Sequence, residues 1–433
     1  MRIKNYDYQP LKKLCSRIGD GLHGTPEYSE VSKIPFINGN NLKNGQISVT
    51  NNTNYVTEKE YERNFIKLDN NSLLLSINGT LGSIAFYRDE VIMLGKSAAY
   101  LNFKTPINKF YYYYFQLAGV QAYFYNVATG STIKNLSLKS IQDFEVPVPS
   151  KNEYEAISKI LSDLDAKIEL NNKINAELEA MAKLIYGYWF VQFDFTDKNG
   201  NPYKTSGGKM VFNEELRREI PEGWEVKRLI DLCNKIGDGI HGTPNYVEDS
   251  QYKFINGNNL KNGFIQTDAD TKNVSLEEYE KYFIQLDEGT ILLSINGTLG
   301  NLAVYTGEKV MLGKSSAYIN CKSNYRSYCY QFLKQPHMPK LFWNVATGST
   351  IKNLSLDSIK KLKISVPNED LVGEFHKRIG MMDNKRKNIF KENQKLAELR
   401  DWLLPMLMNG QVRVGEVEEK LGMVAEEAKN YNS

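Results

Sequence analysis

The sequence predicts an α+β fold in which two similar domains are each followed by a long helix. The first observation is an internal repeat: the thirteen residues 126–138, NVATGSTIKNLSL, return letter for letter at 344–356, 218 positions later. The second is a series of short apolar runs bounded by Gly and Asn, which is typical of strands. The third is a heptad pattern after each copy, which indicates long helices. A repeat of this length can hold whole domains.

The same displacement of 218 residues relates four further pairs of segments, so the two copies align without a net gap. The pairs are GDGLHGTP with GDGIHGTP (19–26 and 237–244), FINGNNLKNG (36–45 and 254–263), SINGTLG (76–82 and 294–300) and MLGKS (93–97 and 311–315). The repeat therefore covers both predicted domains.

Composition excludes several classes of protein. With 433 residues and 41% hydrophobic residues the chain can form substantial cores. It has no apolar run long enough to span a membrane and no secretion signal at its start. The four cysteines lack the spacing of a disulfide framework or zinc site, and Cys15 and Cys233 are expected to pack as small apolar residues. We expect a soluble, cytoplasmic protein.

The net charge is +3, and Lys plus Arg minus Asp plus Glu is only +4 for residues 1–150 and +1 for residues 211–368. A nearly neutral domain does not attract a polyanion through its bulk charge. Any nucleic-acid surface must therefore be a local patch.

Within the first copy the residue patterns predict a sequence of short elements. We expect strands at 73–77 and 84–87, loops at 19–24 and 38–45, a helix at 110–125, a turn or helix start at 136–141, and an edge strand at 145–149, since proline interrupts this last segment.

Apolar residues then recur at alternating steps of four and three. The first seam is Ile157, Leu161, Leu164, Ile168, Asn171, Asn175, Leu178, Ala182, Ile185 and Trp189; the second is Phe375, Ile379, Met382, Arg386, Ile389, Asn393, Leu396, Arg400, Leu403 and Leu407. Two long helices with apolar stripes most simply pack on each other. The alternative is that each packs against its own domain.

These patterns divide the chain into six parts. They are a first domain (1–150), a first long helix (151–195), a linker (196–210), a second domain (211–368), a second long helix (369–409) and a charged tail (410–433).

Catalytic motifs are not evident in the repeated loops. His23 and His241 have no neighbouring nucleophile or carboxylate pattern, and the four histidines do not show metal-ligand spacing. GDG-x-HGTP is rich in glycine but lacks the Lys-Ser/Thr ending of a phosphate loop. A structural histidine at a tight turn and a histidine that contacts a base are both compatible with this pattern.

The remaining repeated residues are short and polar, and such side chains read base edges or hold phosphates. Ordinary turn chemistry or helix capping is the alternative for each of them. The candidate DNA-binding residues of the first copy are His23, Thr25, Asn38, Asn40, Asn41, Lys43, Asn78, Thr80, Lys96, Ser97, Tyr100, Thr129, Ser131, Thr132 and Lys134. Those of the second copy are His241, Thr243, Asn256, Asn258, Asn259, Lys261, Asn296, Thr298, Lys314, Ser315, Tyr318, Thr347, Ser349, Thr350 and Lys352.

The chain resembles the specificity subunit of type I restriction–modification systems over essentially its full length. The resemblance rests on GTLG (79–82 and 297–300), GSTIKNLSLKSIQDFEVPVP (130–149), IYGYWFVQFDF (185–195), IPEGWEVKRL (220–229) and LRDWLLPMLMNGQVRV (399–414). Their order and duplication make the match specific.

The resemblance implies a non-catalytic DNA reader with target-recognition domains at 1–150 and 211–368. Each would read one half of a split site on double-stranded DNA, and an antiparallel pair of helices would set the gap. Two modification subunits, which bind S-adenosylmethionine and methylate adenine, would dock on the chain, and restriction subunits can be added for cleavage. The chain itself would need no cofactor, metal or membrane. Segments 186–193 and 402–408 would either dock these partners or lie buried in the helix pair.

Near-identical reading loops predict that both domains prefer the same short sequence. With antiparallel helices the recognised site would be an interrupted palindrome, because protein two-fold symmetry maps onto DNA two-fold symmetry. Parallel helices would predict a direct repeat. Two rival functions remain: an enzyme that uses His23 and His241, and a coiled-coil scaffold for protein partners that reads no bases.

Overall fold

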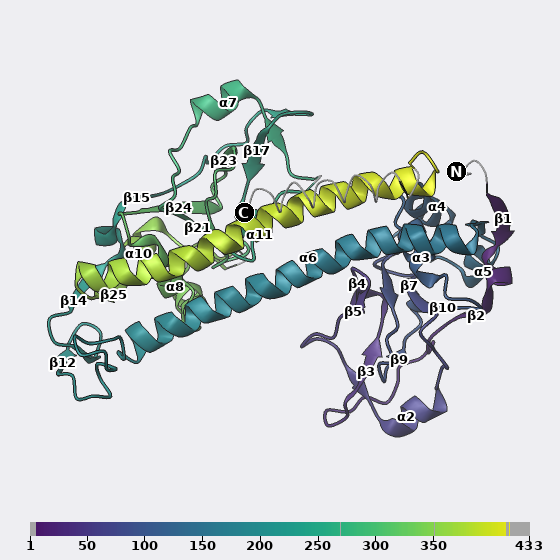
Figure 1. Ribbon diagram of the computed structural model, residues 1–433, viewed down its shortest axis with the longest axis horizontal. Coiled ribbons are helices and arrows are strands. Elements are labelled where there is room, and N and C mark those ends of the chain that lie inside the picture. The colour runs from purple at the N-terminus through teal and green to yellow at the C-terminus, as the bar shows by residue number, and fades with distance from the viewer. Residues whose placement is uncertain (1–5, 269, 350, 413–414, 416–433) are drawn as a thin grey trace. The chain divides into compact units, whose positions relative to one another are not determined.

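A computed structural model describes residues 6–268, 270–349, 351–412 and 415 (Figure 1). The chain forms two compact units. Unit 1 contains Met1–Leu170 and Asn393–Ser433, and unit 2 contains Asn171–Glu392. Both long helices therefore contribute to both units. The predicted tail 410–433 lies outside the described residues apart from 410–412 and 415.

Unit 1 is organised around a four-stranded antiparallel sheet with the strand order β2-β10-β7-β8. Its strands are β2 (Cys15–Asp20), β7 (Ser72–Ser76), β8 (Ile84–Phe86) and β10 (Ala98–Phe103). The predicted strands at 73–77 and 84–87 are confirmed as β7 and β8. The prediction of a loop throughout 19–24 is wrong at its start, because Gly19 and Asp20 continue β2 and pair with Tyr100 and Ala99 of β10.

Smaller elements surround this sheet. A three-stranded sheet contains β6 (Tyr55–Val56), β3 (Ile34–Ile37) and β9 (Met93–Leu94), and a hairpin contains β4 (Leu42–Lys43) and β5 (Gln46–Ile47). The short helices are α1 (Leu11–Leu14), η1 (Gly39–Asn41), α2 (Glu58–Arg63) and α5 (Leu138–Gln142). The predicted edge strand is confirmed as β11 (Glu145–Val148), which among the described strands pairs with β1 (Asp7–Pro10) alone.

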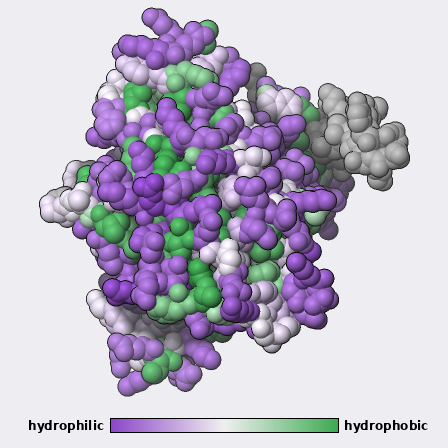
Figure 2. Space-filling model, turned by 90° about the vertical axis from the view of Figure 1, so that its left-hand side faces the viewer, coloured by the Kyte–Doolittle hydropathy of each residue, from purple (hydrophilic) through white to green (hydrophobic). Residues whose placement is uncertain are grey.

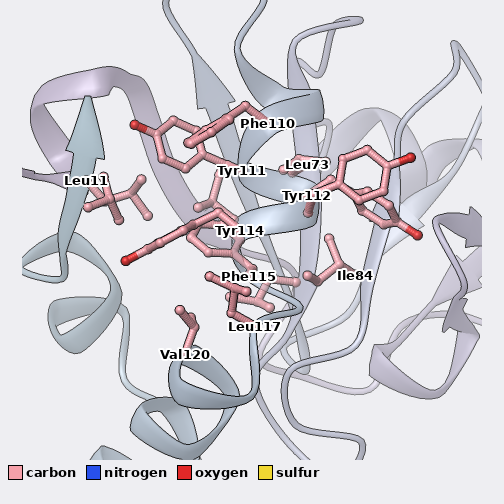
Figure 3. Close-up of a cluster of buried hydrophobic side chains, with 14 of the residues drawn as sticks. Leu11, Leu73, Ile84, Phe110, Tyr111, Tyr112, Tyr114, Phe115, Leu117 and Val120 are labelled. Atoms are coloured by element: carbon pink, nitrogen blue, oxygen red, sulfur yellow. The ribbon is translucent and has the colours of Figure 1, made fainter. Parts of the chain in front are cut away.

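Aromatic side chains fill the core of unit 1. Figure 3 shows rings of α3 (Asn108–Tyr114) gathered near Leu73 and Ile84 of the sheet. The prediction of one helix over 110–125 is wrong, because the chain turns after Tyr114 and continues as α4 (Ala118–Val127). Aromatic residues occur on every side of this segment, so one straight helix could not bury them all. The turn brings Phe124 of α4 within 5.7 Å of the Phe115 ring centroid.

Unit 2 repeats this architecture. Its central sheet has the order β15-β24-β21-β22, with β15 (Cys233–Asp238), β21 (Thr290–Ser294), β22 (Leu302–Val304) and β24 (Ser316–Cys321). A two-stranded sheet pairs β14 (Glu225–Arg228) with β25 (Lys363–Val366). A four-stranded sheet has the order β16 (Tyr246–Val247), β20 (Asn273–Val274), β17 (Tyr252–Ile255) and β23 (Val310–Leu312). A hairpin contains β18 (Leu260–Lys261) and β19 (Phe264–Ile265). The helices are η3 (Leu229–Leu232), η4 (Gly257–Asn259), α7 (Leu276–Lys281), α8 (Arg326–Leu333), α9 (Met338–Val345) and α10 (Leu356–Lys360).

In unit 2, a hairpin of β12 (Met210–Asn213) and β13 (Arg218–Pro221) precedes the repeated part of the chain. Cys15 and Cys233 occupy the first position of β2 and β15, and both are buried, which confirms that they pack as small apolar residues.

The heptad patterns form the two longest helices, α6 (Lys151–Tyr186), which continues as a π-helical turn η2 (Gly187–Val191), and α11 (Glu369–Met408). In unit 2, Asn171 Nδ2 donates to Glu392 Oε2 at 2.8 Å and Arg386 Nη2 donates to Glu179 Oε2 at 3.0 Å, so the helices run antiparallel there. In unit 1, Arg400 Nη1 donates to Asp165 Oδ1 at 2.8 Å.

Both packing alternatives for the helices are realised within each unit. Leu161 of α6 and Leu407 of α11 belong to the core cluster of unit 1, together with residues of the sheet and of α3. In unit 2 the core includes Tyr186 of α6 and Phe375 of α11, whose ring centroids are 6.0 Å apart. Each helix end therefore packs on its partner helix and on a domain core.

The outer surface mixes polar and apolar residues, as is usual for a face in contact with water. The face shown in Figure 2 is mainly hydrophilic, with apolar side chains between the polar ones. Among the described residues, none of the helices combines the length and the apolar character that crossing a bilayer requires.

Candidate nucleic-acid interface

The repeated loops of unit 1 meet at one edge of its central sheet. Because the sheet is antiparallel, β2 and β7 end at the same edge at which β8 and β10 begin. These strand ends carry the loops after β2, between β7 and β8, and before β10. We use the name polar edge for these three loops together with the turn η1 and the loop 128–136. The corresponding segments of unit 2 form a second polar edge.

Backbone and side-chain hydrogen bonds tie these loops together. The backbone N–H of Gly39 donates to Ser97 Oγ at 2.9 Å, and the N–H of Ile77 donates to the Ser97 carbonyl at 3.0 Å. The N–H of Leu136 in turn donates to the Ile77 carbonyl at 2.9 Å. Segments that lie far apart in the sequence are thus held as one surface.

One glycine shows how closely these loops approach each other. A Cβ added to Gly39 would lie 2.1 Å from Ser76 Oγ, so a side chain at this position would separate η1 from the end of β7. The equivalent Gly257 would meet Ser294 Oγ at the same distance. The repeated glycine is therefore required by packing.

Unit 2 reproduces the same bonds. Gly257 N–H donates to Ser315 Oγ at 2.9 Å, Ile295 N–H donates to the Ser315 carbonyl at 2.9 Å, and Leu354 N–H donates to the Ile295 carbonyl at 2.9 Å. The polar edge is consequently duplicated in geometry as well as in sequence.

Two pairs of predicted DNA-binding residues are buried. The Asn41 side chain is 6% exposed; its Nδ2 donates to the Ser48 carbonyl at 2.9 Å, and its Oδ1 accepts the Asn38 N–H at 3.0 Å. Asn259 is 9% exposed and makes the same two types of bond. These side chains stabilise the turn, so we exclude them from the candidate DNA contacts.

Tyr100 and Tyr318 are the second buried pair, with exposures of 2% and 4%. Their rings close over Gly19 and Gly237, where an added Cβ would meet the tyrosine hydroxyl at 2.5 Å. Burial raises the pKa of Tyr100 above its usual value. These tyrosines also belong to the fold rather than to the surface.

Several predicted residues are half-buried and support the loops. Ser97 Oγ, which accepts from Gly39 N–H, donates to Asn38 Oδ1 at 2.9 Å, and Ser315 bonds Asn256 in the same way. Asn78 and Asn296 are half-buried too, and each forms a backbone bridge to the asparagine of the loop opposite, Asn135 or Asn353.

Most of the other predicted residues are exposed. In unit 1 these are His23, Thr25, Asn40, Thr80, Lys96, Thr129, Ser131 and Thr132, with Lys134 half-buried; in unit 2 they are His241, Thr243, Asn258, Thr298, Lys314, Thr347 and Ser349, with Lys352 half-buried. Thr350 lies outside the described residues. Lys43 and Lys261 are exposed on the hairpins β4–β5 and β18–β19, which lie beside β8 and β22 rather than on the polar edge.

The two repeated histidines lie at the ends of β2 and β15. His23 Nε2 lies 2.8 Å from Asp20 Oδ2, and His241 Nε2 lies 2.9 Å from Asp238 Oδ2. Their side chains are 72% and 74% exposed. Each imidazole is thus anchored by its carboxylate and remains accessible to a ligand. Among the described residues, no group of three or more His, Cys, Asp and Glu side chains is arranged to hold a metal ion.

Sequence reasoning missed an aromatic residue on each polar edge. Tyr125 is 57% exposed, and the Lys134 ammonium lies 5.0 Å from its ring centroid. In unit 2, Trp343 is 58% exposed, and Lys352 lies 5.5 Å from its ring. Such cation–π contacts position the ammonium group at the surface. Because Tyr125 corresponds to Trp343, this position lies just outside the identical stretch 126–138.

The turn role of Asn41 gives a prediction for stability. Asn41→Ala leaves the Asn38 N–H and the Ser48 carbonyl without their partner, and we expect a loss of about 1–3 kcal/mol in the free energy of unfolding. Urea unfolding of the full chain measures this loss. Asn40→Ala is the matched control, because Asn40 is the exposed neighbour in the same turn. Equal stability of the two variants would contradict the assigned role.

Comparison with known proteins places the chain in a family. The type I restriction modification DNA specificity domain matches twice, at residues 12–180 and 221–393. The MjaIX specificity subunit of a type I restriction enzyme from Methanocaldococcus jannaschii is 26% identical over 432 residues, covering 96% of this chain and 95% of that protein. The HindI specificity subunit from Haemophilus influenzae is 26% identical over 341 residues, covering 65% and 72%.

The fold is also similar to a solved structure. The S subunit of a type I restriction–modification system from M. genitalium superposes with a TM-score of 0.56 at 19% identity, covering 94% of this chain and 98% of that chain. The two domain matches span most of the described residues and coincide with the two copies of the repeat. The chain belongs to the family of type I restriction–modification DNA specificity subunits.

Proposed function

We propose that this chain is the non-catalytic subunit that gives a type I restriction–modification complex its DNA sequence specificity. The observation that carries the proposal is the duplicated polar edge, whose loops are held by the same bonds in both units and present exposed Asn, Thr, Ser, His and Lys side chains. These are the side chains that reach base edges and phosphates. A surface needed only for folding would not have to remain identical where it is exposed.

The proposed recognition domains are residues 1–150 and 211–368, and the long helices 151–195 and 369–409 act as spacers between them. In this proposal the helices set the gap between the half-sites and dock two modification subunits that use S-adenosylmethionine to methylate adenine. Trp402 of α11 is 54% exposed and offers an apolar contact for such a partner. By contrast, Trp189 and Phe190 are buried, which supports a core role for these two residues of segment 186–193.

We infer further that both domains read the same half-site and that the whole site is an interrupted palindrome. Two observations support this inference. The exposed candidate residues described in both copies, from His23 and His241 to Ser131 and Ser349, are identical in type, and the helix segments paired in unit 2 run antiparallel. We propose that an antiparallel pair along the whole of both helices would relate the two domains by a two-fold axis, and such symmetry would match inverted half-sites.

The decisive experiment reconstitutes the full chain with its modification subunits and maps the methylated adenines on genomic DNA by single-molecule sequencing. We expect one motif with two identical, inverted half-sites. Methylation without any fixed motif would refute the specificity function. A fixed motif with two unrelated half-sites would refute only the palindrome.

Removing Lys134 and its counterpart Lys352 should weaken binding to every DNA sequence alike. Lys134 lies over Tyr125 at the surface, where its ammonium can hold a phosphate. For the complex carrying Lys134→Ala and Lys352→Ala, we expect the negative slope of log K against log salt to become shallower by about 0.9 per lost contact. Lys109→Ala, an exposed lysine of α3, is the control. A changed motif with an unchanged slope would instead assign these lysines to base reading.

Two other functions make different predictions. A coiled-coil scaffold would assemble with its protein partners but would not shift DNA of any sequence. An enzyme that uses the His23–Asp20 pair would methylate or cleave DNA as the isolated chain, whereas we expect activity only in the assembled complex.

A further inference from the structure

The loop 128–136 of unit 1 and its counterpart in unit 2 each carry one exposed aliphatic side chain among polar residues. Ile133 is 60% exposed and Ile351 is 61% exposed. A single exposed apolar residue is ordinary on protein surfaces and indicates nothing by itself. The internal repeat, however, allows every exposed position of one copy to be compared with its counterpart in the other.

This comparison separates Ile133 from the other exposed aliphatic residues of its domain. Val31, Val49 and Val91 are exposed in the first copy, and their counterparts in the second are the polar residues Asp249, Thr267 and Lys309. Among the described residues of the two copies, Ile133 and Ile351 form the aliphatic pair that is strongly exposed in both. An aliphatic side chain that gains nothing from burial is thus present in both copies here, whereas the three exposed valines have polar counterparts.

The loop that presents Ile133 is closed and anchored. Thr129 N–H donates to the Asn135 carbonyl at 3.0 Å, and Asn135 N–H donates back to the Thr129 carbonyl at 2.7 Å. Gly130 has a φ of +101°, and a Cβ there would lie 2.2 Å from the Ile133 carbonyl oxygen. Only glycine lets the loop close this tightly, and closure turns the Ile133 carbonyl inward and its side chain outward. The loop of unit 2 has the same bonds and a φ of +100° at Gly348.

The neighbours of Ile133 indicate what it contacts. Ser131 and Thr132 are exposed beside it, and Lys134 is held over Tyr125, so the loop presents one apolar group between residues that bond phosphates and base edges. In the major groove the apolar group of the bases is the C5-methyl of thymine. We propose that Ile133 and Ile351 each contact a thymine methyl group in their half-site. This rests on the proposed function: a half-site methylated on adenine contains an A·T pair, and therefore a thymine.

The test compares thymine with deoxyuridine, which lacks the methyl group. The full chain, assembled with its modification subunits, is titrated with duplexes that carry the mapped site with either base in both half-sites. Burial of one methyl group corresponds to about a fourfold change in affinity, hence roughly 15-fold for two half-sites. We expect the unaltered complex to show this preference for thymine, and the complex carrying Ile133→Ala and Ile351→Ala to bind both duplexes equally.

Val91→Ala, which removes an exposed aliphatic side chain elsewhere in the domain, is the control and should leave the preference unchanged. A thymine preference that persists in the Ile variant overturns the proposal. If that preference persists while the affinity for both duplexes falls by the same factor, Ile133 acts as a wedge between base steps and does not contact the methyl group. Failure of the unaltered complex to bind the site at all would refute DNA reading itself, and this result is distinguishable from the other two.

Discussion

A duplex with two inverted half-sites is expected to bind the assembled complex on the order of 10²- to 10³-fold more tightly than a duplex with the same half-sites as a direct repeat. Specific binding typically exceeds non-specific binding by about 10³- to 10⁷-fold, and a direct repeat satisfies only one recognition domain. Roughly half of the specific free energy is then lost. The expectation follows from the proposal that both domains read the same half-site and that the spacer helices pair antiparallel.

Competition binding with three duplexes measures this effect. All three have the same spacer length and base composition, and they differ in whether the second half-site is inverted, direct or scrambled. The direct and scrambled duplexes should bind alike, because neither offers the second domain a half-site in the correct orientation. Tighter binding of the direct repeat would show that the two domains face the DNA in the same orientation, and would contradict the antiparallel arrangement.

Much of this fold was predictable because its patterns are local. The runs at 73–77 and 84–87 become β7 and β8, and the heptads become α6 and α11, since periodic burial depends on neighbouring positions in the chain. The repeat added information that periodicity lacks. It predicted that Cys15 and Cys233 share one environment, and both are buried in the first position of a strand.

The roles of individual loop residues were not predictable in the same way. Asn40 and Asn41 are adjacent, polar and repeated, yet Asn40 is exposed and Asn41 is buried. In a tight turn successive side chains point in different directions, and repetition is required equally by folding and by ligand binding. Ile133 shows the converse: a search for polar residues passes over an apolar side chain whose exposure only the structure reveals.

The distant ion-pair partners of two arginines in the long helices were also not predictable from the sequence. Arg386 and Arg400 occupy apolar seam positions, and each has a carboxylate nearby in the sequence, Asp383 or Asp401. The structure supplies distant partners: Glu179 for Arg386, and Asp165 for Arg400. Asp165 and Asp383 are equivalent in the repeat, so each copy retains an aspartate on the helix while its cationic partner differs.

Replacing Arg386 with methionine is expected to destabilise unit 2 by about 3–5 kcal/mol, the usual effect of removing one partner from a buried ion pair. Arg386 is 3% exposed, and its guanidinium lies 3.0 Å from Glu179 and 3.7 Å from Asp383. Methionine fills similar volume but leaves both carboxylates with less compensating charge. Hydrogen exchange of the full chain, followed in peptides of unit 2, measures the loss separately from unit 1.

The matched control is Arg400→Met in unit 1. Arg400 is 28% exposed, so solvent screens its interaction with Asp165, and the expected loss is about 1 kcal/mol or less. A companion variant that combines Arg386→Met with Glu179→Gln removes one of these carboxylates, while Asp383 keeps its ion pair with Arg326, and it should recover part of the stability. Equal effects of Arg386→Met and Arg400→Met would show that burial does not determine the strength of these pairs.

The pH dependence of the Arg386→Met variant separates a charge effect from a packing effect. Burial already raises the pKa of Asp383, and Arg326 and Arg386 oppose that rise. Without Arg386 the pKa rises further, so the folded state of the variant takes up a proton that the unfolded state does not hold. A carboxyl with a higher pKa in the folded state loses stability as the pH rises through that range. The deficit of Arg386→Met should therefore shrink as the pH falls toward the raised pKa of Asp383, whereas a deficit caused by lost packing alone would not change with pH.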